Sequence, residues 1–405
     1  TELTSCEQDA TGVTATLRDA GGATRVRARY LIAADGARSR AREVLGIPMH
    51  GTPALYRSVN VLLNADLTKW VSDRPAALYF IEQPDLRATF LTINGVNRWG
   101  FLINLPLEAS VEAYTSERCA EVIRAAAGVP DLDVEILGVD PWVAAAQVAE
   151  RYRAGRVFLA GDAAHHMPPT GGFGLNTGVQ DVHNLAWKLA AVLHGWAEPA
   201  LLDTYEGERL PYGRAITEQS LKNSLSMGRG APAPDDPASS ASRARPEFLN
   251  EIGMVFGAAY ASPAVIPDGT PPTVVANPVT EYVPSGRPGG RAPHVWLERD
   301  GHPISTLDLS GMGFGLLAGE RGASWRDAAR AASPALGIPL AAFTVGAGAD
   351  IGDPERRWAA AYGVESDGAV LVRPDGHVAW RSRSGAPDPK RDLEQVFQGV
   401  LARQS

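Results

Sequence analysis

Hydrophobic and polar residues alternate over short runs in the first third of the chain, which is the pattern of β-strands with one buried face. The alternation occurs at residues 3–7, 13–17 and 24–30, and it leads to a buried run at 30–34. The same pattern predicts later strands at 58–63, 77–81, 88–93, 99–103, 133–137 and 143–148. A helix is expected at 115–127, where Gly128 ends it. Residues 51–150 thus predict a mostly antiparallel sheet with one helix packed on it.

Helical periodicity becomes prominent after residue 150. A short buried run at 157–160 ends in a Gly-Asp pair, and a loop at 163–174 leads into an expected helix at 175–193. A second helix is expected to begin near Pro199 and to continue through residue 214. Beyond residue 284 the predicted order is strand, helix, strand, helix, hairpin, helix, which is the order of the thioredoxin fold.

Two segments lack the regular hydrophobic positions that a core requires. Residues 228–246 are rich in Gly, Pro, Ala and Ser, and they predict a surface loop or a mobile flap. Residues 284–293 are rich in Pro, Gly and Arg, and they predict a linker. Because 405 residues are too many for one compact core, we expect two or three domains.

Composition and charge narrow the function. The net charge is −8 with acids and bases interspersed, which indicates no surface for nucleic acid or an anionic membrane. No apolar run reaches the roughly 18 residues that cross a bilayer. Two cysteines, Cys6 and Cys119, are too few for a disulfide framework or a zinc cluster, and they suit the cytoplasm. Neither lies beyond residue 284, so thioredoxin-type thiol chemistry is excluded there.

The strongest chemical signal is the glycine-rich stretch at 161–178, GDAAHHMPPTGGFGLNTG. A carboxylate at the end of a strand, here Asp162, can accept hydrogen bonds from the hydroxyls of a polyol. Glycines let the backbone approach a planar ring, and the N–H groups of a helix start favour negative charge. The alternative is a plain strand-to-helix turn in which Asp162 caps the next helix.

This stretch, with its flanks at 151–160, 181–190 and 201–209, resembles the second FAD motif of the class A flavoprotein monooxygenases, relatives of p-hydroxybenzoate and phenol hydroxylases. The resemblance implies that Asp162, which follows Gly161, binds the ribityl chain of FAD. It implies that Pro168 and Gly172 line the flavin ring. The residues that it assigns to the pyrimidine edge are Gly174, Leu175 and Asn176.

A second stretch at 35–42, DGARSRAR, is by itself a turn entering a helix, with Ser39 as its cap. It resembles the other fingerprint of the family, which takes part in binding FAD and NAD(P)H. The positions that carry over are Asp35 and Arg42.

The whole chain resembles the longer subgroup with a thioredoxin-like tail, the tailoring oxygenases of aromatic polyketides and indolocarbazoles. The resemblance implies an α/β and α+β fold: an FAD-binding Rossmann-like domain, an inserted antiparallel sheet for the substrate, and a thioredoxin-like domain without cysteines. The expected boundaries are 1–50 and 151–225 for the FAD-binding domain, 51–150 for the sheet domain, 226–283 for the loop and connection, and 284–405 for the tail. The family's opening βαβ unit, with its Gly-x-Gly-x-x-Gly, has no counterpart before residue 30. We therefore expect the sequence to be a fragment.

Aromatic residues of the predicted sheet are the candidates for contact with a substrate. Trp142 can stack on an aromatic ring or belong to the core, and the further candidates are Tyr79, Phe90 and Phe101. The adjacent pair His165 and His166 is interpreted as loop packing, because neighbouring side chains in an extended loop point apart and make a poor metal site. No catalytic base is assigned.

The resemblance implies a monooxygenase that uses FAD and NAD(P)H to hydroxylate a polycyclic aromatic natural product with O₂, through a C4a-hydroperoxyflavin, in secondary-metabolite biosynthesis. The cofactor carries the difficult step. Two alternatives stay open: a flavin-dependent oxidase that forms quinones on a similar scaffold, and a non-catalytic protein that sequesters an unstable intermediate. A homodimer is compatible with each of them.

Overall fold

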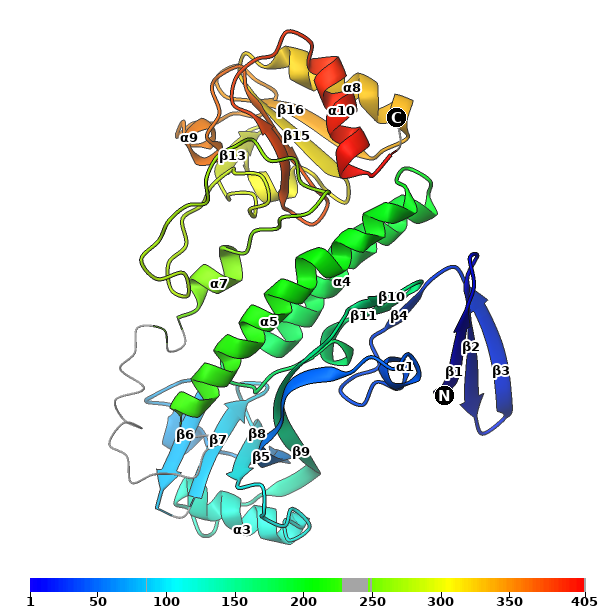
Figure 1. The fold of residues 1–405 in the computed structure, drawn as a ribbon. Coiled ribbons are helices and arrows are strands. Elements are labelled where there is room, and N and C mark those ends of the chain that lie inside the picture. Colours follow the sequence, from blue (N-terminus) through cyan, green and yellow to red (C-terminus); the bar gives the residue numbers. More distant parts are fainter. Residues whose placement is uncertain (85, 228–246, 248–249, 404–405) are drawn as a thin grey trace.

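The computed structural model describes residues 1–84, 86–227, 247 and 250–403 (Figure 1). The loop or flap predicted at 228–246 lies outside these residues. Among the helices that are described, none has both the length and the apolar character that crossing a bilayer demands.

The N-terminal part contains two small sheets. Strands β1 (Glu2–Gln8), β2 (Val13–Asp19) and β3 (Gly22–Ala28) form an antiparallel sheet in that order. The next strand, β4 (Leu31–Ala33), pairs in parallel with β11 (Val157–Leu159), whose other neighbour is β10 (Arg153–Ala154). Because parallel strands end at the same edge, the two sequence motifs that follow β4 and β11 begin side by side.

A six-stranded sheet forms the middle of the molecule, in the order β12-β9-β5-β8-β7-β6. Its strands are β5 (Met49–Asn64), β6 (Leu78–Gln83), β7 (Leu86–Thr92), β8 (Arg98–Leu105), β9 (Glu135–Ala149) and β12 (His165–His166). A short helix, α2 (Thr68–Val71), follows β5. Helix α3 (Ser116–Ala127) packs its apolar side on one face of the sheet, which confirms the helix predicted at 115–127.

Strand β9 corrects one sequence-based prediction. The breaks at Gly138 and Pro141 suggested two strands, but the structure has a single strand of 15 residues. Proline is tolerated there because β9 pairs with β12 only at residues 147 and 148, so its outer edge is open around Pro141. A register shift opposite Leu62 and Leu63 accommodates the residues near Gly138.

Two long helices connect the sheet to the C-terminal domain, as Figure 1 shows. Helix α4 (Phe173–Leu193) confirms the prediction of a long helix at 175–193, and it is followed by the 3-10 turn η2 (Pro199–Leu202). Helix α5 (Asp203–Ser226) packs beside α4 and reaches β9 of the sheet. The short helix α1 (Arg40–Val44) follows the first motif.

The C-terminal domain holds a four-stranded sheet in the order β16-β15-β17-β18. The strands are β15 (Phe314–Gly319), β16 (Leu340–Val345), β17 (Ala369–Val372) and β18 (Val378–Ser382), and the helices are α8 (Ala323–Leu336), α9 (Trp358–Tyr362) and α10 (Pro389–Val400). The α-helix α7 (Ile252–Phe256) and a separate antiparallel hairpin, β13 (Trp296–Arg299) with β14 (His302–Ser305), precede this sheet in the chain. Trp187 and Ala191 of α4 share one core with Phe314 and Trp325 of this domain, so the domain is docked on α4.

Candidate functional site

The turn after β11 lies directly against α4. Gly161 begins the 3-10 turn η1 (Gly161–Ala163) with φ +61°, a conformation that favours glycine. A Cβ placed on Gly178 of α4 would lie 3.2 Å from the Cα of Gly161. Glycine at both positions therefore lets the helix approach the turn closely, and this brings Asp162 to the first turns of α4.

The start of α4 is open. Its N-cap is Gly172, with φ +68°, and no side chain caps the helix. A Cβ on Gly174 would meet no atom within 4 Å, and the side chain of Leu175 is 81% exposed. Asn176 donates from Nδ2 to the carbonyl of Gly172 at 2.7 Å and so fixes the turn. Backbone N–H groups that are free at a helix start suit a negatively charged edge of a ring.

Asp162 is exposed at the end of β11, and within the described ranges its carboxylate accepts no hydrogen bond, although its negative charge acts on the nearby His166. Pro168 is buried in the loop that leads from the turn to α4. A free carboxylate beside an uncapped helix start fits the ribityl chain and the pyrimidine edge of FAD. These residues therefore fit the cofactor that the sequence motif implies, whereas the individual contacts stay predictions.

The buried side chain of Asp181 on α4 fixes the η1 turn by hydrogen bonds. Its Oδ2 accepts the backbone N–H of Gly161 at 3.1 Å and the Nε2 of His165 at 2.7 Å, and its Oδ1 accepts Nε of Arg209 at 2.8 Å. Burial opposes its ionisation, but the bond from His165 and the charge of Arg209 outweigh burial, so the pKa of Asp181 lies below its ordinary value. Asp181 is thus a positioning residue for the turn that carries Asp162.

His165 is consequently part of this buried packing. No group of three or more potential metal ligands occurs in the part of the chain that is described.

Asp35 and Arg42 join the two motifs. Asp35 accepts the backbone N–H of Ala41 at 3.0 Å, which ties its carboxylate to the start of α1. The buried guanidinium of Arg42 donates to the carbonyl of Ala163 at 2.9 Å and to the carbonyl of Ala37 at 3.0 Å. Arg42 therefore connects the first motif to the η1 turn, and direct contact of Asp35 or Arg42 with a cofactor stays a prediction.

The sheet presents different residues to a substrate than we expected. Phe90 and Phe101 are buried in the core formed with α3, and Tyr79 packs against the same core. These three side chains fill the α3 face of the sheet because strand positions alternate between faces, and their assignment as substrate contacts was wrong. Trp142 lies on the opposite face, where its Nε1 donates to Oδ1 of Asn60 at 2.8 Å.

The face opposite α3 is a partly exposed surface that combines apolar side chains with the amide of Asn60. A row of paired residues crosses it from Phe80 through Thr89 and Leu102 to Asn60. Phe80 remains 40% exposed, as do Leu62 and Leu78. We name the set Phe80, Leu102, Asn60 and Trp142 the platform. Such a surface suits a flat aromatic molecule that also carries a polar group.

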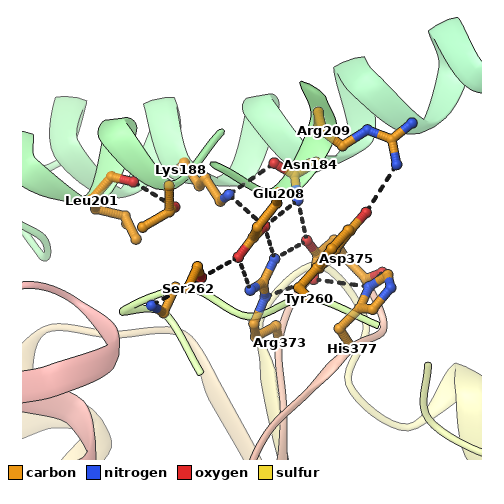
Figure 2. Close-up of polar contacts among 12 residues, drawn as sticks. Asn184, Lys188, Leu201, Glu208, Arg209, Tyr260, Ser262, Arg373, Asp375 and His377 are labelled. Atoms are coloured by element: carbon orange, nitrogen blue, oxygen red, sulfur yellow. Dashed lines mark hydrogen bonds and ion pairs between the residues drawn. The ribbon is translucent and has the colours of Figure 1, made fainter. Parts of the chain in front are cut away.

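On its other side α4 meets a buried ionic network, shown in Figure 2. Arg373 precedes the hairpin turn of the C-terminal domain and is completely buried. Its guanidinium donates to both carboxylate oxygens of Glu208 at 2.7 and 2.8 Å and to Asp375 at 2.5 and 3.0 Å. Burial lowers the basicity of arginine, but these two carboxylates outweigh burial and raise the pKa of Arg373.

Three residues of α4 complete the network. Lys188 donates to Glu208 at 2.7 Å, Asn184 bridges Glu208 and Asp375 at 2.7 and 3.1 Å, and Trp187 donates from Nε1 to Asp375 at 3.1 Å. Burial lowers the pKa of Lys188 to about 8, against the attraction of Glu208. The network therefore fixes the C-terminal hairpin to one face of α4 and pairs the charges buried there.

Sequence reasoning missed Asp181, Glu208, Arg373 and Asn60. Asp181 had a signal, because it lies inside the stretch that resembled the family, yet its partner Gly161 is 20 residues away and only the fold joins them. Arg373 lies 165 residues from Glu208, and local pattern gives no sign of that pairing.

Comparison with known proteins matches both parts of the chain. Residues 1–220 match the FAD binding domain family and residues 285–403 match the aromatic-ring hydroxylase C-terminal family. The chain is 44% identical to a 4-methyl-5-nitrocatechol 5-monooxygenase of a Burkholderia species, over all of this chain and 74% of that protein. It is 41% identical to the tetracenomycin A2 monooxygenase-dioxygenase of Streptomyces glaucescens, over all of this chain and 72% of that protein. The solved ternary complex of an aklavinone-11 hydroxylase with FAD and aklavinone superposes with a TM-score of 0.88 at 40% identity, over 99% of this chain and 74% of that one.

Proposed function

The chain belongs to the FAD-binding aromatic-ring hydroxylases, and from that premise we propose that it adds one oxygen atom of O₂ to a polycyclic aromatic natural product. It is a flavoprotein monooxygenase with FAD as its cofactor, and NAD(P)H is its reductant. Solved relatives that carry a polycyclic substrate support this class of substrate. The setting is the biosynthesis of secondary metabolites.

One observation carries the proposal: the free carboxylate of Asp162 lies beside an uncapped start of α4. A helix start of this kind favours the negative charge that a reduced flavin gains, by about 0.3–1 kcal/mol at an exposed site and more when it is buried. No side chain competes for the helix start, since the N-cap is Gly172.

The residues of the flavin site and the platform bind the cofactor and the substrate or fix the position of those that do. Asp162 holds the ribityl hydroxyls, and the first turn of α4 holds the ring edge. Asp181 keeps the turn in place through the N–H of Gly161. When bound, FAD accepts hydride from NAD(P)H and activates O₂ for transfer to the substrate. The platform then supports the substrate ring, where Asn60 offers an amide to a phenolic or carbonyl oxygen.

The experiment is turnover of the FAD-loaded protein with NAD(P)H and a panel of polycyclic phenols. We expect NAD(P)H consumption that rises with substrate, and a product heavier by one oxygen atom. A product that has lost two hydrogens and gained no oxygen would show that the reaction is a quinone-forming oxidation and not a hydroxylation. Tight binding of the phenol without turnover would instead indicate sequestration.

We also propose a cytoplasmic location. Support comes from Cys6 and Cys119, which are both free thiols and so suit a reducing compartment. A homodimer is compatible with this proposal. Sedimentation of the purified protein distinguishes a homodimer from a monomer.

A further inference from the structure

A cavity of about 420 Å³ lies on the side of α4 that faces the C-terminal domain. Gln180, His183 and Asn184 of α4 form one wall, and the rest comes from α7, the segment after it, and the C-terminal domain. Its volume is within the ~300–1,000 Å³ typical of small-molecule sites. The cavity is separate from the flavin site, because neither Asp162 nor residues 172–176 line it.

The walls of the cavity are mostly apolar, and the guanidinium of Arg291 also lines them. Phe256, Leu307 and Leu317 contribute apolar surface. The half-buried guanidinium of Arg291 lies over the ring of Phe256, 4.8 Å from its centroid. No carboxylate in residues 1–84, 86–227, 247 and 250–403 forms an ion pair with Arg291. A partly buried arginine without a counter-ion is a natural partner for an anionic ligand.

The acid at the cavity does not neutralise Arg291. Asp375 lines the cavity, but its carboxylate already accepts Arg373, Asn184 and Trp187. The neighbouring His377 stacks on the ring of Tyr260 with centroids 4.2 Å apart, which adds a flat aromatic surface (Figure 2). Positive charge and aromatic surface therefore occur together in the cavity.

We propose that this cavity is a second ligand site, which binds a small aromatic molecule carrying a carboxylate or phenolate. The anionic group pairs with Arg291, and the ring packs among Phe256 and the leucine side chains. This proposal does not depend on the hydroxylation proposed above, because none of its residues belongs to the flavin site or the platform.

The position of the site connects its occupant to α4. Asn184 and Asp375 line the cavity and also hydrogen bond to each other at 3.1 Å, within the ionic network. Trp187, which donates to Asp375, is one helical turn from His183 in the cavity wall. A ligand in the cavity thus lies close to the hydrogen bonds of the Trp187 indole, and a change of tryptophan fluorescence provides an optical signal of binding.

The test is a titration of the FAD-loaded protein with 2-naphthoate, in which binding is measured by calorimetry and by tryptophan fluorescence. We expect one binding site, and about tenfold or greater weakening in Arg291→Gln, since a charge-assisted hydrogen bond is lost. The neutral 2-naphthamide is expected to bind the wild type as weakly as 2-naphthoate binds that variant. Arg299→Gln is the matched control, because Arg299 also lies over an aromatic ring, Phe343, outside the cavity.

Two further variants separate this cavity from the substrate platform. Ala258→Trp fills the cavity and is expected to abolish naphthoate binding, whereas Asn60→Leu on the platform leaves it unchanged. Absence of naphthoate binding, or binding that Arg291→Gln does not weaken, would overturn the proposal. Loss of binding in Asn60→Leu with full binding in Arg291→Gln would place the naphthoate on the platform and overturn it as well. The Arg291→Gln comparison suffices should Ala258→Trp fail to fold.

Discussion

The polar groups at the start of α4 differ from those on its face toward the C-terminal domain in burial and in pairing. At the turn after β11, the helix start has no capping side chain, and the exposed carboxylate of Asp162 accepts no hydrogen bond within the described residues, although its charge acts on the nearby His166. Toward the C-terminal domain, Lys188, Glu208 and Arg373 are completely or almost completely buried and are paired with one another. The start of α4, which we call the open side, therefore leaves polar groups available to a ligand, although Asp181 further along the helix is buried and paired with the turn. The face toward the C-terminal domain, which we call the closed side, fits a structural role.

The contrast suggests a rule for separating binding from structure in this molecule. A polar group that burial has already matched with a partner has little left to offer a ligand. A group that the fold leaves open, such as the Asp162 carboxylate, gains its partner only on binding. Substitutions on the closed side should thus affect stability first, and substitutions on the open side should affect ligand binding first.

The largest effect is expected on the closed side. Arg373→Ala removes the partner of Glu208 and Asp375 and leaves two carboxylates with one buried cation, Lys188. The expected loss is about 3–5 kcal/mol in the free energy of unfolding, measured by urea denaturation. Arg383→Ala, at an exposed position of the same domain, is the control. Equal free energies of unfolding for the two variants would contradict a structural role for the closed side.

The reverse behaviour is expected for Asp162→Ala. FAD should bind about 10- to 100-fold more weakly, since charge-assisted bonds to the ribityl hydroxyls are lost. The free energy of unfolding without FAD should stay within about 0.5 kcal/mol of wild type, because Asp162 is exposed. FAD affinity from flavin fluorescence quenching is the measurement. Wild-type affinity in this variant would contradict the assignment of the open side.

The pH dependence of stability sharpens the description of the closed side. The pKa of Lys188 is about 8 in the folded protein and about 10.4 in an unfolded chain, so the unfolded state binds more protons between these values. The stability of wild type relative to Lys188→Met should therefore rise with pH across this window, by on the order of 2 kcal/mol. Urea denaturation from pH 7.5 to 10.5 measures it. A difference that stays flat would mean that Lys188 keeps its proton in both states.

The smallest effect is expected on the platform. Trp142→Phe keeps an aromatic ring but loses the hydrogen bond to Asn60, which is worth about 0.5–1.5 kcal/mol. We expect KM for the phenol to rise a few-fold with FAD affinity unchanged. Phe90→Leu, in the core against α3, is the comparison and should lower stability instead. A larger change of KM in Phe90→Leu than in Trp142→Phe would support the sequence-based assignment of Phe90 as a substrate contact.

Sequence alone predicted the elements with strong local patterns. The helix with Gly128 at its end and the long helix after the glycine-rich loop were both found, because capping and periodicity are local properties. It failed where a choice between two faces of the sheet was needed. Alternation indicates that neighbouring residues of a strand point to opposite faces, but it does not tell which face α3 covers. It also split β9 at Pro141, because only the neighbouring strands show that an open edge tolerates proline there.

Partners of buried groups were the least accessible to prediction. The bond from Gly161 to Asp181 and the pair of Arg373 with Glu208 join distant parts of the chain, and their residue types alone do not specify a partner. The glycine-rich motif predicted where a cofactor fits, whereas the residues that hold the motif in place required the fold.

The separation of 165 residues between Glu208 and Arg373 has a consequence for synthesis on the ribosome. Chains grow at about 5–20 residues per second, so roughly 10–30 seconds pass after Glu208 is made before Arg373 exists. During that interval Lys188 is the one cation among the described residues of α4 and α5 that pairs with Glu208, and the helix surface that packs against the C-terminal domain is uncovered. The packing surface of the nascent helices therefore stays exposed to water or to a chaperone until the segment that carries Arg373 is made.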